Sequence, residues 1–315
     1  MPRLPRLKVE GEDGWYHLWN CANGQKRAFP LQKDLARAEF IRLLKLYSSI
    51  YFCRVAAFEV MGSHFHVILR FDKPRPLSRA QLKLRAMALY GKKRRKWVEA
   101  WSDESWDTFE KRLFNVSEFM RNVEEVFTRW YNPFHGCKGH FWADRFKSTV
   151  LGGPQAVLDA ILYVELNGVR AGLVERPEAY KGGSLYLREA GRDGWLMPLR
   201  EFMHERRTTK ELYVRFKELC YYRGAVITKP GQKAIRPEVI AEERARGFAQ
   251  RGVFLKKLRC ITDGLVFGAE AEVLTFLAKL RLKGEKWALR RKEAAKHLDG
   301  AFYTLREQRG NDVPT

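Results

Sequence analysis

Residues 60–69 read "VMGSHFHVIL", an apolar run that carries two histidines two positions apart. Gly62-Ser63 is a turn signal between this stretch and the β-rich run before it, so the sequence predicts a β-hairpin. In a strand, residues i and i+2 project from the same face. His64 and His66 are therefore expected to point together from a rigid sheet, where two imidazoles can bind one divalent cation. Two hydrogen-bonded histidines at a sheet edge are the alternative.

The stretches before the hairpin predict the rest of a sheet layer. The aromatic segment "GWYHLWNCA" (14–22) alternates weakly, as strands do, and residues 33–49 carry apolar side chains at helical spacing. A strand, a helix and then a hairpin predict an α+β fold, a small α/β sandwich built on a central antiparallel sheet. His17 lies on the first strand, where a structural role and a place near the histidine pair are both open.

Two more helices are predicted before residue 190. One ends at about Tyr131, and the other opens after Gly152-Gly153-Pro154 and closes near Gly168. On the second helix Tyr163 and Asn167 are four residues apart, so they share one face. This pattern suggests a metal held by the two histidines of the hairpin and the Asn167 carbonyl oxygen, with the Tyr163 hydroxyl aimed at a metal-bound phosphate. A core tyrosine followed by a helix C-cap is the alternative.

Residues 72–107 form a basic insertion. The segment "GKKRRKWVEAW" (91–101) holds five consecutive basic residues, with Trp97 and Trp101 beside them. Such a block is either a solvated or disordered segment, or a segment that binds nucleic acid through cations placed next to aromatic rings. The candidate DNA-binding residues here are Lys92, Lys93, Arg94 and Arg95.

The pattern changes after about residue 190. We predict a domain over residues 1–190 and a mainly helical accessory region over 191–315, which would extend DNA binding through the basic helix end "ALRRKEAAKH" (288–297).

Composition narrows the class of partner. The chain has 315 residues, and Lys+Arg 59 against Asp+Glu 37 gives a net charge of +22, which favours a polyanionic partner. No signal peptide and no run of about 18 apolar residues stands out, so we expect a soluble protein without a membrane span. The five cysteines lack any C-x-x-C pair, which argues against structural zinc or a disulfide framework and for a cytoplasmic setting.

Three ordered motifs resemble those of the single-tyrosine HUH transposases, in particular the REP-associated tyrosine transposases. They are "VMGSHFHVIL", "GHFWADRFKSTVL" (139–151) and "YVELNGVRAGLV" (163–174), within a resemblance that covers roughly residues 14–190. The resemblance implies the ferredoxin-like HUH endonuclease fold. It also implies a bacterial, nucleoid-associated protein, monomeric or homodimeric, that cleaves and rejoins single-stranded DNA next to hairpins.

The resemblance also assigns roles to residues. His64 and His66 bind Mg²⁺ or Mn²⁺, Asn167 lies beside the metal, and Tyr163 is the nucleophile that takes the 5′-phosphate. Arg145 and Lys147 match positions that the family keeps basic, and Arg170 is expected to meet a phosphate. His135 and His140 precede "FWADRF" and are expected to line the site without binding metal.

The chain departs from the family pattern at two places. Gly62-Ser63 stand where Pro-Asn is usual before the first histidine, and Asn167-Gly168 stand where Asn-Pro is usual in the helix motif. Neither departure removes a ligand or the nucleophile.

The assigned chemistry is physically coherent. A cation on a non-bridging phosphate oxygen neutralises charge and favours in-line attack. A phenol with a pKa near 10 is also a good leaving group, so a phosphotyrosine bond conserves energy for rejoining.

Three other functions remain open. The first is a catalytically silent, domesticated protein that binds hairpin DNA or RNA. The second is a phosphoesterase that uses histidines alone, although such enzymes need two facing histidine motifs and only one H-x-H is present. The third is metal-independent RNA processing.

Overall fold

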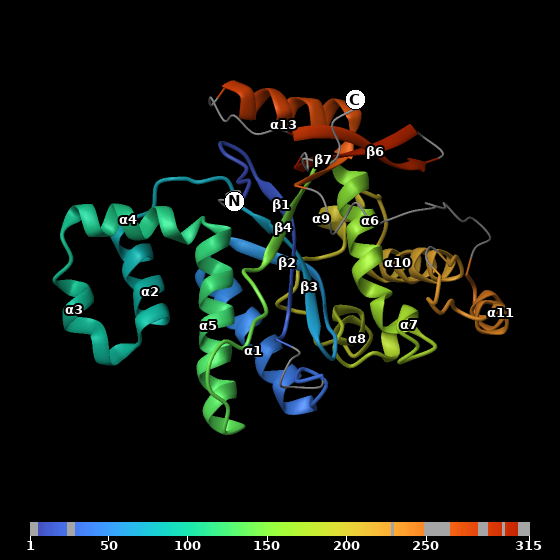
Figure 1. Ribbon diagram of the computed structural model, residues 1–315, viewed down its shortest axis with the longest axis horizontal. Coiled ribbons are helices and arrows are strands. Elements are labelled where there is room, and N and C mark those ends of the chain that lie inside the picture. Colours follow the sequence, from blue (N-terminus) through green and yellow to red (C-terminus); the bar gives the residue numbers. More distant parts are fainter. Residues whose placement is uncertain are drawn as a thin grey trace, which may run out of the picture.

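The computed structural model describes residues 6–23, 29–227, 230–248, 265–282, 289–297 and 300–307. Seven strands form one sheet in the order β2-β3-β1-β4-β5-β7-β6. Strands β4 and β5 pair in parallel, and the other neighbouring pairs are antiparallel. The predicted α+β class, with a largely antiparallel sheet, is confirmed. Figure 1 shows helices on both faces of this sheet.

The hairpin predicted from "VMGSHFHVIL" is present. Strand β2 (Cys53–Val60) pairs with β3 (His64–Phe71), and β1 (Gly14–Cys21) pairs with β3 on its other side. The β1–β3 register places Trp19 opposite His66, and β4 (Lys147–Leu151) then places Lys147 opposite Trp19. Because facing residues share a sheet face, these three side chains form one row across three strands.

The two faces of the sheet bury different cores. On one face, Phe65, Val67 and Leu69 pack with helices α1 (Asp34–Ile50) and α5 (Val116–Phe134). On the other face, Ile68 packs with helix α6 (Pro154–Glu165). The same core includes residues of α9 (Arg200–Met203) and α10 (Thr209–Gly224). The histidine pair belongs to the second face, since His64, His66 and Ile68 alternate with the first set.

The helix predicted to run to Gly168 is interrupted. Helix α6 (Pro154–Glu165) ends at Leu166, whose φ of −104° and ψ of 0° are not helical, and a short helix α7 (Asn167–Arg170) follows. The prediction of one continuous helix was therefore wrong by about one turn. The cause lies in tertiary hydrogen bonds at Gly168, described with the site below.

The basic insertion is a folded helical lobe. It comprises α2 (Arg79–Tyr90), η1 (Lys92–Arg94), α3 (Arg95–Glu99) and α4 (Asp103–Leu113). Its aromatic rings pack edge to face or tilted against one another, with Trp106 and Phe109 buried and Trp97 exposed; the rings are those of Tyr90, Trp97, Trp101, Trp106 and Phe109. The disordered alternative for residues 92–96 is thus wrong. The lobe extends from the α1–α5 side, at the left of Figure 1.

The region after residue 190 contains helices and also strands. Its helices are α9 (Arg200–Met203), α10 (Thr209–Gly224), α11 (Pro237–Ala245) and α13 (Glu270–Leu282). They follow η2 (Pro177–Ala179) and α8 (Ser184–Glu189). Strands β5 (Val266–Ala269), β6 (Leu289–His297) and β7 (Gly300–Glu307) extend the main sheet.

The basic end "ALRRKEAAKH" was expected to be helical, and residues 289–297 of it form β6 instead. Pairing with β7 along a hairpin outweighs the helical preference of its alanines and lysines. The proposed division of the chain at residue 190 remains a prediction. No helix in the described ranges is long and apolar enough to cross a membrane.

Candidate metal and tyrosine site

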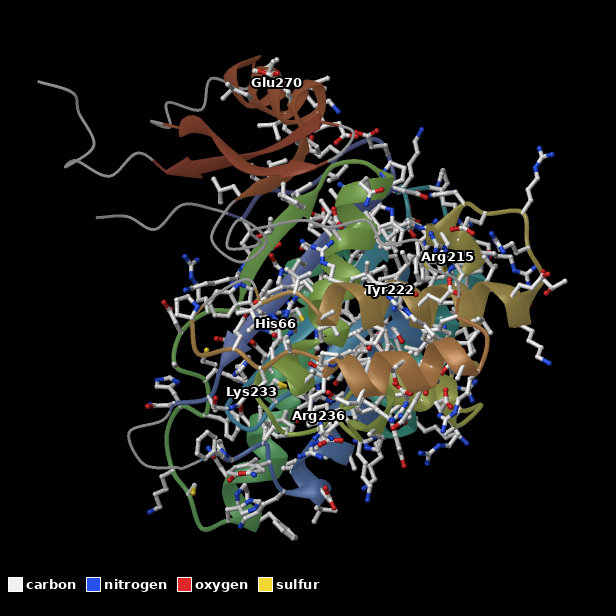
Figure 2. The ribbon with its side chains drawn as sticks, turned by 90° about the vertical axis from the view of Figure 1, so that its right-hand side faces the viewer. His66, Arg215, Tyr222, Lys233, Arg236 and Glu270 are labelled. Carbon is white, nitrogen blue, oxygen red and sulfur yellow. The ribbon has the colours of Figure 1, made fainter. Side chains whose placement is uncertain are left out.

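Four predicted or suspected residues meet on the α6 side of the sheet. The Tyr163 ring centre lies 5.7 Å from that of His66 and 6.2 Å from that of His17. The His64 and His66 ring centres are 5.2 Å apart. These contacts arise because β1 and β3 place the histidines on one face, against which α6 packs. Figure 2 views the molecule from this side, with the labelled His66 beside α6.

The Nδ1 atoms of both hairpin histidines have hydrogen-bond partners. His66 Nδ1 is 2.9 Å from His17 Nε2, and His64 Nδ1 is 3.2 Å from the Ser63 hydroxyl oxygen. Burial lowers the pKa of His64, which favours the neutral imidazole that binds metals. When a partner accepts the Nδ1 proton, the Nε2 lone pair is the one left for a cation, as in many metal sites.

The donor set for a cation is small. Within the described part of the chain, no three His, Cys, Asp or Glu residues are grouped so that they can hold a metal ion. Asn167 donates from its amide nitrogen to the carbonyls of Tyr163 and Val164, at 3.3 and 3.2 Å. The end of the preceding helix α6 thereby orients the amide, with Oδ1 on the opposite side. Two imidazoles and one amide oxygen fit a partly hydrated divalent cation.

The structure explains why glycine rather than proline follows Asn167. Gly168 N–H donates to the buried Glu59 carboxylate at 3.0 Å, a bond that proline cannot make. A Cβ at residue 168 would lie 2.9 Å from Cγ of Tyr180, whose hydroxyl donates to the Val60 carbonyl. Burial, and next Glu165, raise the pKa of Glu59. The hairpin that carries the histidines is thus joined to the turn that follows Tyr163.

We expect Gly168→Ala to lower the free energy of unfolding by about 1–3 kcal/mol, because the new methyl group overpacks against the Tyr180 ring. Urea unfolding followed by circular dichroism measures the change. Gly194→Ala is the matched control, since nothing lies within 4 Å of a Cβ there, and it should change stability by less than about 0.5 kcal/mol. Equal losses in both variants would show that the contact with Tyr180 is unimportant.

The predicted DNA-binding residues occupy different environments. Lys147 is exposed, and its ammonium lies 4.3 Å from the centre of the Trp19 ring, which is 6.2 Å from the His66 ring. Arg145 is exposed nearby, whereas Arg170 is buried. Lys92, Lys93, Arg94 and Arg95 are exposed on the lobe, on the other side of the sheet. The structure therefore does not bring the lobe residues to the histidine pair.

The two loop histidines differ in their surroundings. His135 stacks on Tyr131 at the end of α5, and His140 is exposed. The sequence patterns did not identify Glu59 or the hydrogen-bonding role of Ser63. Glu59 could have been recognised as an acidic residue within an otherwise apolar strand, whereas Ser63 was recognised only as part of a turn.

No protein-family model and no curated protein matches this chain. Among solved structures, the chain is similar to one described as "Structure of the REP associates tyrosine transposase bound to a REP hairpin". The sequence identity is 14% and the TM-score is 0.40, over 62% of this chain and 89% of that chain. This similarity suggests a structural relationship only.

Proposed function

We propose that the protein is a metal-dependent single-stranded DNA endonuclease and strand transferase of the HUH type, which acts next to DNA hairpins through a 5′-phosphotyrosine at Tyr163. The observation that supports this most is the contact of the Tyr163 ring with the rings of His66 and His17. A tyrosine from a helix and a histidine pair from a sheet thus share one site. The strongly basic composition supports a nucleic-acid substrate.

His64 and His66 would hold Mg²⁺ or Mn²⁺ through Nε2, with Asn167 Oδ1 as a third ligand. Donation of their Nδ1 protons to His17 Nε2 and to the Ser63 hydroxyl oxygen would fix the required tautomers. When bound, the cation neutralises charge on the phosphate and favours in-line attack. Since two ligands are imidazoles, Mn²⁺ should bind more tightly than Mg²⁺ in vitro.

In the cleavage step, the Tyr163 oxygen would form a bond to phosphorus while the bond to the 3′ oxygen breaks. The phenol loses its proton, and the leaving oxygen gains one to become a free 3′-hydroxyl. Rejoining reverses both changes, so no external energy source is needed.

The row formed by Lys147, Trp19 and His66 suits a single strand. A cation beside a partly exposed aromatic ring combines attraction for phosphate with base stacking, which is how proteins bind single strands without sequence preference. The row crosses the sheet toward the histidine pair, and would lead a strand to it.

The proposal is tested by incubating the protein with Mn²⁺ and single-stranded DNA that contains a hairpin, drawn from beside its own gene. A slower-migrating, protease-sensitive band marks the covalent adduct. EDTA and fully duplex DNA are the controls in which the band should be absent. DNA binding without an adduct, under every divalent metal tried, would favour the catalytically silent binding protein instead.

The lobe supplies a second, separate contact to DNA in this proposal. Lys93 and Arg94 are exposed, and neither has an ion pair within the described part of the chain. We expect Lys93→Ala with Arg94→Ala to weaken hairpin binding and to reduce the slope of log K against log salt by about 2. Because the lobe lies across the sheet from Tyr163, the cleavage rate at saturating DNA should stay unchanged.

Fluorescence anisotropy over a salt series measures the lobe's contribution. Arg121→Ala with Arg129→Ala removes the same charge from exposed arginines that are paired with Glu118 and Glu125, and serves as the control. An identical slope for both double variants would show that net charge, not the lobe, governs binding.

A further inference from the structure

Two buried arginines lie behind Tyr163 with most of their hydrogen-bonding groups unused. Arg170, on α7, is 6% exposed, and its Nε, Nη1 and Nη2 atoms all lack a hydrogen-bond partner. Arg223, on α10, is 4% exposed, and its Nε and Nη2 atoms lack one too. A buried guanidinium without acceptors is costly, because it has lost its hydration without replacement.

Ion pairs and hydrogen bonds among the described residues leave these two cations largely unbalanced. Arg223 Nη1 pairs with Asp159 at 2.7 Å. Glu59 is the other nearby acid, but burial and Glu165 raise its pKa, and its Oε2 accepts from Gly168. Burial, and next Arg223, lower the pKa of Arg170 to about 10, which still leaves it charged at neutral pH. Within the described residues, the two guanidinium groups therefore share a single ion pair, the one between Arg223 and Asp159.

The unbalanced charge adjoins the candidate nucleophile. Arg170 Cζ lies 5.5 Å from the centre of the Tyr163 ring. The carbonyl of Arg170 accepts from Lys233 N–H at 3.0 Å, and the exposed Lys233 side chain adds positive charge above α7. Figure 2 labels Lys233 and also Tyr222, the neighbour of Arg223 on α10.

We propose that Arg170 and Arg223 form a buried binding site for one tetrahedral oxyanion, a phosphate group of the substrate strand next to the bond that Tyr163 attacks. Guanidinium groups bind phosphate with paired N–H donors, and the unused atoms of both residues supply them. The identity of the anion as a strand phosphate rests on the proposed function. The existence of an oxyanion site does not.

The site is tested by thermal unfolding of the full chain in EDTA, with inorganic phosphate compared with chloride at matched ionic strength. Saturating phosphate, at about 100 times its Kd, should raise Tm by roughly 5 °C. Arg170→Met should abolish this response. Without phosphate, its Tm should equal or exceed that of the wild type, because an unpaired buried charge is gone.

Three further variants make the result unambiguous. Arg170→Lys keeps the charge and should retain part of the phosphate response, whereas the exposed-residue control Arg145→Met should retain all of it. Tyr163→Phe should also respond fully, so a failure of the cleavage chemistry leaves this test intact. A large fall in Tm for Arg170→Met, or a full phosphate response in that variant, would overturn the site and make Arg170 a structural residue.

The dinucleotide dTpdT, which carries a single phosphodiester, separates the two sources of the anion. If it raises Tm at lower concentration than inorganic phosphate does, the strand assignment is supported. If only inorganic phosphate acts, the site takes a free oxyanion and the strand assignment is wrong.

Discussion

Tyr163→Phe should abolish the covalent DNA adduct and lower the cleavage rate by at least about 1,000-fold, while hairpin binding stays within a factor of about two. The substitution removes only the attacking oxygen. The ring, which contacts His17 and His66, is kept, so the site should remain folded. Denaturing gels score the adduct, and anisotropy scores binding.

Tyr186→Phe is the matched control for the nucleophile. Tyr186 is partly exposed on α8, and its ring faces Arg192 rather than the histidines. It should cleave as the wild type does. If Tyr163→Phe forms the adduct at an unchanged rate, another residue is the nucleophile and the proposed mechanism is wrong.

His66→Ala should weaken Mn²⁺ binding by at least about 100-fold and abolish cleavage, because it removes a ligand and the partner of His17 together. Ser63→Ala should have a smaller effect of about 10-fold, because it removes only the hydroxyl that contacts His64 Nδ1. Isothermal titration calorimetry measures both affinities directly, apart from any reaction.

The exposed His140 provides the control for metal binding, and His140→Ala should leave the Mn²⁺ affinity unchanged. If His66→Ala keeps the wild-type affinity, the cation binds elsewhere. If Ser63→Ala does so while His66→Ala does not, the ligand assignment survives but the tautomer argument for His64 fails.

The sequence predicted the features that depend on local periodicity. The two-residue repeat of a strand placed His64 and His66 on one face, and the Gly62-Ser63 turn correctly predicted the hairpin. The four-residue spacing of Tyr163 and Asn167 predicted a common helix face, but the helix that this argument requires ends between them, at Leu166.

Features that depend on distant contacts were not predictable in this way. The turn that follows α6 is held by the hydrogen bond from Gly168 N–H to Glu59, 109 positions away in the chain. Arg170 resembles a surface phosphate ligand in the sequence, but the fold buries it beside residues from several elements, among them Arg223 of α10 and Glu59 of β2. Residues 289–297 have helical character by themselves, and pairing with β7 makes them a strand.

The start of the tyrosine helix depends on the far end of the chain. Gly152 N–H donates to the Phe267 carbonyl at 2.7 Å, and Glu272 of α13 sits so close to Gly153 that a Cβ there would lie 2.0 Å from its carboxylate oxygen. A chain that stops before Val266 would leave β4 as an uncovered edge strand next to the helix that carries Tyr163. Such a truncated product should self-associate through its unpaired backbone groups rather than remain a smaller folded monomer.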